Sequence, residues 1–419
     1  MLFLYLTIML LPFQDHPILG AALFRAGPVP ITPIKVVAVP MLLAAALFPA
    51  PRDAAPHRAM RIQILYAAFA GWLLMVTLVQ TFSLPAFSTA QLLEFVLLLI
   101  AARSLVRNQQ RFVNTIRVIV LAEVVGNLWT YKQYYLLHYP RPIGPSSDQN
   151  YEAMALAMAI PLAVWLFQRE KNRFWRLFSI AAVPMMAFGI FVLQSRGGLL
   201  ALCILAIAAW LLNPHKARNL VAAMVLLGIL AAASPGATWR RIAQIQVSGA
   251  PTSGAGLSTE SRVELMRAAL HLTLAYPVFG VGLEQFGPIA ERYNPHIAEV
   301  LPPAMTHVNM VHNTYLEISA SGGLPALVMF IVLLIAANAE LKQVQKGKPA
   351  AEDYRNLALA MRLSLFAFAA AAFFLTAWMQ KELWFIVFLA ASLREIALPA
   401  KRRLLFGSNS APGATKAAA

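Results

Sequence analysis

The sequence has few charged residues and almost no cysteine for its length. Only 12% of its 419 residues are charged, whereas soluble proteins carry about 25%. The single cysteine, Cys203, excludes an internal disulfide framework, a cysteine-based zinc site and an iron–sulfur cluster. Hydrophobic residues make up 59% of the chain, and the mean hydropathy is +0.65. These values exclude a water-soluble globular protein and predict one membrane domain.

Aspartate is also scarce, and this limits the metal chemistry that the chain can support. The four aspartates, Asp15, Asp53, Asp148 and Asp353, are far apart, so no Asp-x-Asp pair can hold a divalent metal on a diphosphate. A Walker A loop, a Gly-x-Ser-x-Gly elbow and a His-Glu-x-x-His motif are absent as well. We therefore expect no metal and no cofactor, and arginines would have to neutralise any diphosphate.

Long apolar runs recur from one end of the sequence to the other. A helix needs about 20 apolar residues to cross about 30 Å of hydrocarbon, and about twelve runs approach this length. We predict an all-α polytopic membrane protein. The predicted spans are Leu2–Leu19, Ile31–Phe48, Ile62–Thr81, Gln91–Val106, Phe112–Leu137, Tyr151–Phe167, Phe174–Leu193, Gly198–Leu212, Ala217–Ser234, Thr314–Leu341, Leu357–Met379 and Leu383–Leu398.

The basic residues indicate how the chain is oriented. The net charge of +16 arises mostly from Lys and Arg in alternate short connections, which is the pattern of cytoplasmic loops. We expect both termini in the cytoplasm and no binding of nucleic acid. On the opposite side, Lys132 and Arg141 are candidates for binding phosphorylated lipid headgroups, or are ordinary interfacial charges.

One extracytoplasmic connection is far longer than the others. We predict transmembrane helices 1–9 in residues 1–234, a large loop with amphipathic helices in 235–313, helices 10–12 in 314–406 and a disordered cytoplasmic tail in 407–419. Loops of this length are usually functional. The chemistry is therefore expected at the extracytoplasmic face of the membrane.

Arg196 is the first charged residue that needs an explanation. It lies in a tight link between two apolar helices, followed by Gly197 and Gly198. Glycines let a ligand approach the backbone, and the N-terminus of the next helix favours an anion. The alternative is an arginine that extends from a helical hairpin to the membrane surface.

Arg262, in the large loop, is the second charged residue that needs an explanation. When Glu260 to Leu274 is wound as a helix at 100° per residue, Arg262 falls in the middle of the apolar side. Arg267 falls on the polar side, where it can pair with Glu264. Because an unpaired buried guanidinium costs several kcal/mol, Arg262 predicts an anionic ligand or a structural ion pair with a distant carboxylate.

His312 is the third candidate functional residue. Thr314 and Glu317 have the spacing of a capping box that opens the tenth span, and Gly323 and Pro325 should loosen that helix. His312 would then precede a helix N-terminus, which disfavours the charged imidazolium. A neutral imidazole could accept a proton from a hydroxyl, or His312 and Asn313 could simply complete the helix end.

Three segments together resemble the O-antigen ligase/polymerase superfamily, within which the closest resemblance is to the lipopolysaccharide O-antigen ligases. Asp148-Gln149-Asn150, ahead of an apolar helix, resembles a weaker fourth feature. The segments occur in the order of the family and with its topology. They are Ser195–Gly198, Ser261–Val263 followed by Ala275–Gly282, and His312–Glu317 followed by Gly323–Pro325.

The resemblance implies a GT-C-like fold and a metal-independent, inverting glycosyltransferase in the bacterial inner membrane, with its active site on the periplasmic face. The implied donor is O-antigen polysaccharide on undecaprenyl diphosphate, and the implied acceptor is a sugar hydroxyl of lipid A–core in lipopolysaccharide biosynthesis. Arg196 and Arg262 would bind the diphosphate, and His312 would act as the base. Other expected substrate contacts are Gly197, Gly198, Asn313, Tyr315, Arg267, Lys132 and Arg141.

Other functions remain compatible with the sequence. Within the superfamily, an O-antigen polymerase or a protein O-oligosaccharyltransferase would carry the same motifs. A polysaccharide-lipid transporter would also have many spans, but its functional charges should lie near the bilayer midplane. The charged candidates here collect toward one face, which favours an enzyme.

Overall fold

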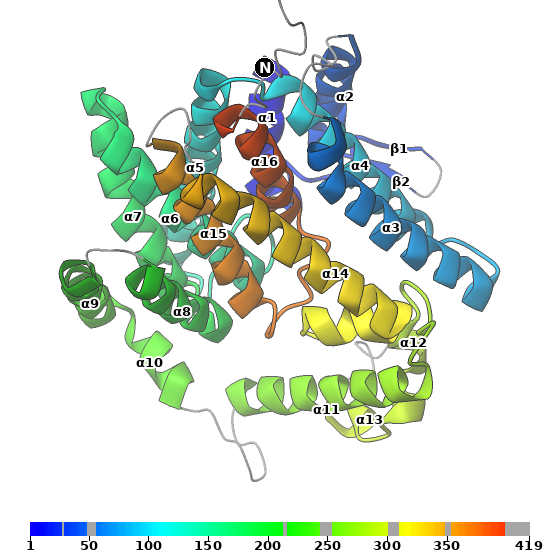
Figure 1. Ribbon diagram of the computed structural model, residues 1–419. Coiled ribbons are helices and arrows are strands. Elements are labelled where there is room, and N and C mark those ends of the chain that lie inside the picture. The colour runs from blue at the N-terminus through cyan, green and yellow to red at the C-terminus, as the bar shows by residue number, and fades with distance from the viewer. Residues whose placement is uncertain are drawn as a thin grey trace, which may run out of the picture.

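The structure is a computed structural model that describes residues 1–26, 29–47, 56–212, 216–243, 254–300, 310–347 and 353–398. Helices make up most of these residues, and a second group of helices lies at one end of the main bundle (Figure 1). The predicted tail, residues 407–419, lies outside the described residues.

Each of the predicted spans overlaps a helix. The helices are α1 (Leu2–Leu10), α2 (Pro33–Leu47), α3 (Pro56–Thr81), α4 (Ala86–Leu105), α5 (Gln109–Tyr131), α6 (Gln149–Arg169), α7 (Arg173–Val192), α8 (Arg196–Leu212), α9 (Lys216–Ala233), α14 (Thr314–Lys346), α15 (Asp353–Ala371) and α16 (Lys381–Ala397). Within the described residues, six of them, α3 to α7 and α14, are long and apolar enough to cross a membrane. The chain is therefore a multi-pass membrane protein built from α-helices.

Two predicted spans are shorter in the structure. The first ends at Phe13, after a 3₁₀ turn, η1 (Leu11–Phe13), and is followed by a short antiparallel hairpin of β1 (Phe24–Ala26) and β2 (Val29–Ile31) that the apolar pattern did not predict. The eleventh ends at Ala371 and not near Met379. Hydrophobicity alone does not distinguish a span from an apolar connection that packs on the bundle.

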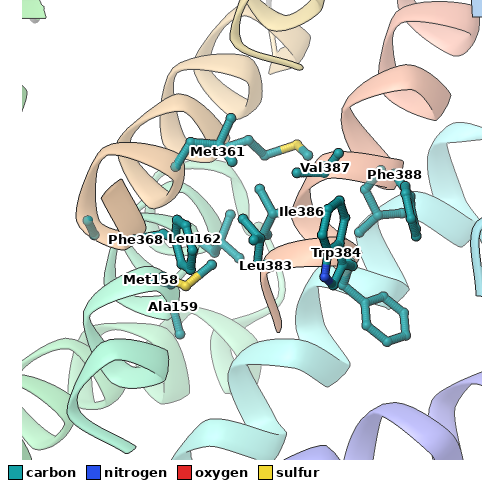
Figure 2. Close-up of a cluster of buried hydrophobic side chains, with 14 of the residues drawn as sticks. Met158, Ala159, Leu162, Met361, Phe368, Leu383, Trp384, Ile386, Val387 and Phe388 are labelled. Carbon is teal, nitrogen blue, oxygen red and sulfur yellow. The ribbon is translucent and has the colours of Figure 1, made fainter. Parts of the chain in front are cut away.

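The helix α6 lies at the centre of the bundle. It packs against α5, α7, α8 and α15, and its small side chains Ala153, Ala157 and Ala163 are fully buried. Small residues let helix backbones approach closely in a membrane, where apolar burial alone does not favour association. Side chains of α6, α15 and α16 meet in the buried cluster that Figure 2 shows, which includes Leu162, Phe368 and Trp384.

The helix α14 presents an apolar stripe away from the bundle. Its exposed side chains Leu324, Val328, Ile331 and Ile335 recur at helical spacing, whereas Phe330 on the other side is fully buried. A continuous stripe of this kind would favour association in water but suits contact with lipid chains.

The same helix is kinked where the glycines predict it. Gly323 has a φ of 72°, and the helix axis changes direction there. The carbonyl of Ala320 accepts from the N–H of Val281 at 2.9 Å, and that of Ser321 accepts from the N–H of Gly282 at 2.8 Å. A loop segment thus supplies hydrogen bonds that the kinked helix lacks.

The large loop contains further helices with a small core of their own. They are α10 (Gly236–Ala243), α11 (Gly254–Ala275), α12 (Phe286–Tyr293) and α13 (Ile297–Val300). Leu265, Ala269, Phe286 and Ile297 are buried together, and α11 packs against the start of α14 (Figure 1). This packing fixes α11, which carries Arg262, against the helix that follows His312.

Candidate active site

Three helix N-termini lie close together at the candidate site. The carboxylate of Asp148 accepts from the N–H of Asn150 at 2.6 Å at the start of α6. The hydroxyl of Ser195 accepts from the N–H of Gly198 at the start of α8, and the amide oxygen of Asn313 accepts from Leu316 in α14. The positive ends of three helix dipoles therefore favour an anion here.

The residue before each N-terminus has a left-handed backbone. Ser147, Gln194 and His312 have φ values of 56°, 53° and 55°. Residues other than glycine rarely adopt this conformation, which costs about 1–3 kcal/mol and persists where the surrounding structure enforces it. The three turns that lead into the site are therefore held by tertiary contacts.

Two side-chain hydrogen bonds join these helices. The Ser195 hydroxyl donates to the Asn150 amide oxygen at 2.9 Å and so connects α8 to α6. The phenol of Tyr151 donates to the carbonyl of Thr376 at 2.9 Å and connects α6 to the turn between α15 and α16. Arg196, which follows Ser195 and is half-buried, is thereby held beside the start of α6.

The turn between α15 and α16 also holds His312 in place. The N–H of His312 donates to the hydroxyl of Thr376 at 3.2 Å, and this hydroxyl donates to the carboxylate of Glu317. The carboxylate also accepts from the N–H of Val311 at 3.4 Å. The predicted capping box of Thr314 and Glu317 is therefore wrong, because Asn313 caps α14 and Glu317 anchors the segment before it.

The imidazole of His312 is mostly buried and lies within the electrostatic reach of two charged groups. Burial, and to a smaller extent the cation of Arg262, lowers its pKa to about 4, although the carboxylate of Asp148 partly opposes them. Arg262 also interacts with Tyr151. The structure thus brings Arg262, His312 and the start of α6 together, and it leaves the imidazole neutral at pH 7.

Not all of the predicted pattern of α11 is found. Arg262 is half-buried on the buried side of the helix, as expected, but Val263 and Leu270 are exposed. Glu264 is buried because its carboxylate accepts from the amide of Asn294 at 2.7 Å. The predicted pair of Glu264 with Arg267 forms at 2.6 Å, and the side chain of Arg267 is 62% exposed.

Several other predicted substrate contacts have structural partners. Gly197 and Gly198 are buried, and an added Cβ would lie 3.1 Å from Phe374 and 2.5 Å from Ala153, respectively. The Asn313 amide also donates to the carbonyl of Phe373, and the hydroxyl of Tyr315 donates to that of Ala369. The close packing of helices accounts for these residue types.

The two cations predicted in the connection before α6 are in different surroundings. The half-buried Arg141 lies beside Gln149, whose amide oxygen can accept from it at 2.9 Å, so Arg141 is at the start of α6. Lys132, in the short helix η2 (Lys132–Leu136), is exposed and lies over the ring of Trp129 at 4.6 Å. Arg141 is the better placed of the two for an anion in the site.

The sequence did not indicate the roles of Tyr151, Glu317 and Thr376. Glu317 belongs to the His312–Glu317 motif, but its spacing suggested a helix cap. Thr376 is a polar residue inside a predicted span, which was a signal that the span ends earlier. A separate group of carboxyl groups, the buried Glu123 and Glu152 and the half-buried Glu382, lies inside the bundle.

A comparison with protein families identifies the class of protein that these helices and this site define. Residues 181–331 match the family model described as O-antigen ligase, a stretch that includes Arg196, Arg262 and His312. This part of the chain is therefore similar to the O-antigen ligase family, and the resemblance predicted from the motifs is confirmed. No curated protein matches the chain.

Proposed function

We propose that the protein is a metal-independent, inverting glycosyltransferase that ligates O-antigen polysaccharide from undecaprenyl diphosphate onto a sugar hydroxyl of lipid A–core. The family match supports the broader statement, a role in polysaccharide ligation or polymerisation. The location of His312 within the electrostatic reach of Arg262 and Asp148, before the capped N-terminus of α14, is the observation that carries the finer proposal.

In this proposal the diphosphate of the donor lies at the arginines. Arg262 and Arg196 are held beside the N-termini of α6 and α8, which add partial positive charge. A guanidinium binds phosphate oxygens in bidentate fashion, and stabilising the leaving diphosphate is the largest electrostatic requirement of the reaction. Arg141 is a third candidate contact.

His312 would accept the proton of the acceptor hydroxyl. The hydroxyl oxygen attacks the anomeric carbon of the donor sugar from the face opposite the diphosphate, the new C–O bond forms, and the bond to the diphosphate breaks. The proton passes to the imidazole, and undecaprenyl diphosphate leaves with the electron pair. A general base of this kind contributes about 10²–10⁴-fold to the rate.

The position of the site also bears on the orientation of the chain in the membrane. The site is built from the connections that the charge pattern assigns to the extracytoplasmic side. We infer a periplasmic active site in the inner membrane, with both termini in the cytoplasm.

Transfer by the purified protein tests the proposal. Undecaprenyl-diphosphate glycan is supplied with lipid A–core, with a second lipid-linked glycan or with a serine-containing peptide as acceptor, in the presence of a chelator. We expect product on lipid A–core. Product only on the lipid-linked glycan or only on the peptide would replace the ligase with a polymerase or a protein glycosyltransferase.

A further inference from the structure

A large groove lies beside the candidate site. Its volume is about 770 Å³, which is within the range of pockets that bind small ligands. It lies between the hairpin segment after α1, the first turns of α2 and α4, the loop before α12 and the turn before α16. All of these segments belong to connections that the charge pattern assigns to the extracytoplasmic side.

The groove ends at the residues that hold His312. Tyr151, Glu317 and Thr376 are part of its lining. The hydroxyl of Thr376 accepts from the N–H of His312 and donates to the carboxylate of Glu317. A ligand in the groove therefore reaches the segment on which the proposed base lies.

The groove lacks the positive charge of the arginine side of the site. Four carboxyl groups and only two ammonium groups line it, and burial raises the pKa of Asp15, one of the four, so the groove offers no excess positive charge. No arginine is among its lining residues in the part of the chain that the structure describes. The charged residues are Asp15, Glu94, Glu284, Glu317, Lys35 and Lys381.

The two ammonium groups already have carboxylate partners. Lys35 pairs with Glu94 at 3.0 Å, and Lys381 lies 3.7 Å from the same carboxylate. Lys381 also donates to the amide oxygen of Gln14 at 3.0 Å. Because both ammonium groups are already engaged and no arginine of the described residues lines it, the groove disfavours the anionic part of the donor.

Polar side chains and aromatic rings of the groove suit sugars. Gln14, Gln91 and Gln380 line it, and the carboxylate of Glu284 accepts from the Ser88 hydroxyl at 2.6 Å. Amides and carboxylates of this kind exchange hydrogen bonds with hydroxyl groups. The ring of Phe87, on the groove wall, is 58% exposed and offers an apolar face.

We propose that this groove binds the uncharged, hydroxyl-rich sugars of the acceptor glycan and directs the accepting hydroxyl toward His312. The proposal rests on the proposed function and adds to it a division of the site by charge. The arginines bind the diphosphate, and the groove binds neutral sugar beside the residues that hold His312.

Binding of a lipid-free, dephosphorylated core oligosaccharide to the detergent-purified full chain tests the proposal. Ala22 is exposed and lines the groove, whereas its neighbour Ala21 is exposed and does not line it. Ala22→Trp should fill the groove and weaken binding by at least about tenfold, and Ala21→Trp should change it by less than about twofold. Thermal unfolding of both variants shows whether they fold.

A second pair of variants tests whether the ring of Phe87 contacts the sugar. Phe87→Ala should weaken oligosaccharide binding by about threefold to tenfold because the sugar loses the ring face. Phe82 is 90% exposed and is not part of the groove, so Phe82→Ala is the matched control. Equal binding by both variants would contradict a stacking role.

Donor binding separates the two possible sources of sugar. Undecaprenyl diphosphate with and without its glycan should bind Ala22→Trp as tightly as wild type, and inorganic pyrophosphate should not compete with the oligosaccharide. Weaker binding of only the glycan-bearing donor would assign the groove to the donor and overturn the proposal. Unchanged oligosaccharide binding by Ala22→Trp would also overturn it.

The groove and the proposed function can fail separately. If the wild type binds the oligosaccharide in the groove but transfers nothing to lipid A–core, the ligase assignment fails and the sugar site stands. If transfer occurs and Ala22→Trp leaves the acceptor KM unchanged, the ligase assignment stands and the groove proposal fails.

Discussion

The cation of Arg262 lies close enough to the imidazole of His312 to lower its pKa. Arg262 lies in α11 and His312 lies in the turn before α14, and both belong to the segments that resemble the family. An anion bound at Arg262 would offset the charge of the guanidinium and raise the basicity of His312. Binding of the donor diphosphate would thus move the proposed base toward the pKa that proton transfer at neutral pH requires.

This coupling predicts a shift in the titration of His312. Without ligand, histidine-selective NMR of the purified protein should give His312 a pKa of about 4, below the ordinary value of 6.5. Addition of inorganic pyrophosphate should raise that value. A pKa near 6.5 in the free protein, or no change with pyrophosphate, would contradict the electrostatic account.

The same pKa predicts a dependence of stability on pH. The folded chain keeps His312 neutral down to a pH of about 4, whereas the unfolded chain binds a proton below about 6.5. The contribution of the neutral imidazole to stability is therefore complete above pH 6.5 and is lost as the pH falls toward 4. His312→Gln should show a smaller loss of thermal stability than wild type across this window.

Thr376 should act as a positioning residue. Thr376→Val keeps the shape of the side chain but removes the hydroxyl that contacts both His312 and Glu317. We expect kcat to fall by about tenfold to a hundredfold because the base is displaced, with little change in the KM for donor or acceptor. Thr376→Ser should restore most of the rate, and equal rates for all three proteins would exclude this role.

Two arginines of α11 form a matched pair for donor binding. Arg262 lies on the buried side near His312, whereas Arg267 is largely exposed and pairs with Glu264. Arg262→Ala should weaken the binding of undecaprenyl diphosphate by about tenfold to a hundredfold, and Arg267→Ala by less than about threefold. If both variants lose affinity equally, Arg267 also contacts the donor.

The kink of α14 should be sensitive to a single methyl group. In Gly323→Ala the new Cβ would lie 2.1 Å from the carbonyl oxygen of Val278 on a backbone with a φ of 72°. We expect a loss of about 1–3 kcal/mol or more in the free energy of unfolding. Gly71→Ala, where a Cβ meets nothing within 4 Å, is the control and should be as stable as wild type in a thermal unfolding assay.

The positions of the membrane helices could be predicted from the sequence because apolar length and flanking charge report directly on the bilayer. The residues at which these helices end could not be predicted from the sequence. The turn after Ala371 is as apolar as a span, but its polar groups bond to the start of α14. Contacts between segments that are distant in sequence decide such boundaries, and hydropathy does not contain them.

The candidate site, too, could be predicted only in part from the sequence. Arg196, Arg262 and His312 were recognisable because charged and titratable groups are costly near a membrane. The role of Glu317 was misjudged because its spacing from Thr314 fits a capping box. The groove could not be predicted at all, since its lining residues come from connections spread over more than 350 positions of the chain, from Gln14 to Lys381.

Transfer of O-antigen from undecaprenyl diphosphate to lipid A–core by wild type and His312→Ala, with a chelator present, tests the central claim most directly. We predict product from wild type and a rate lower by about 10²–10⁴-fold in a variant that folds normally and still binds the donor. Full transfer by the folded His312→Ala protein would contradict the account.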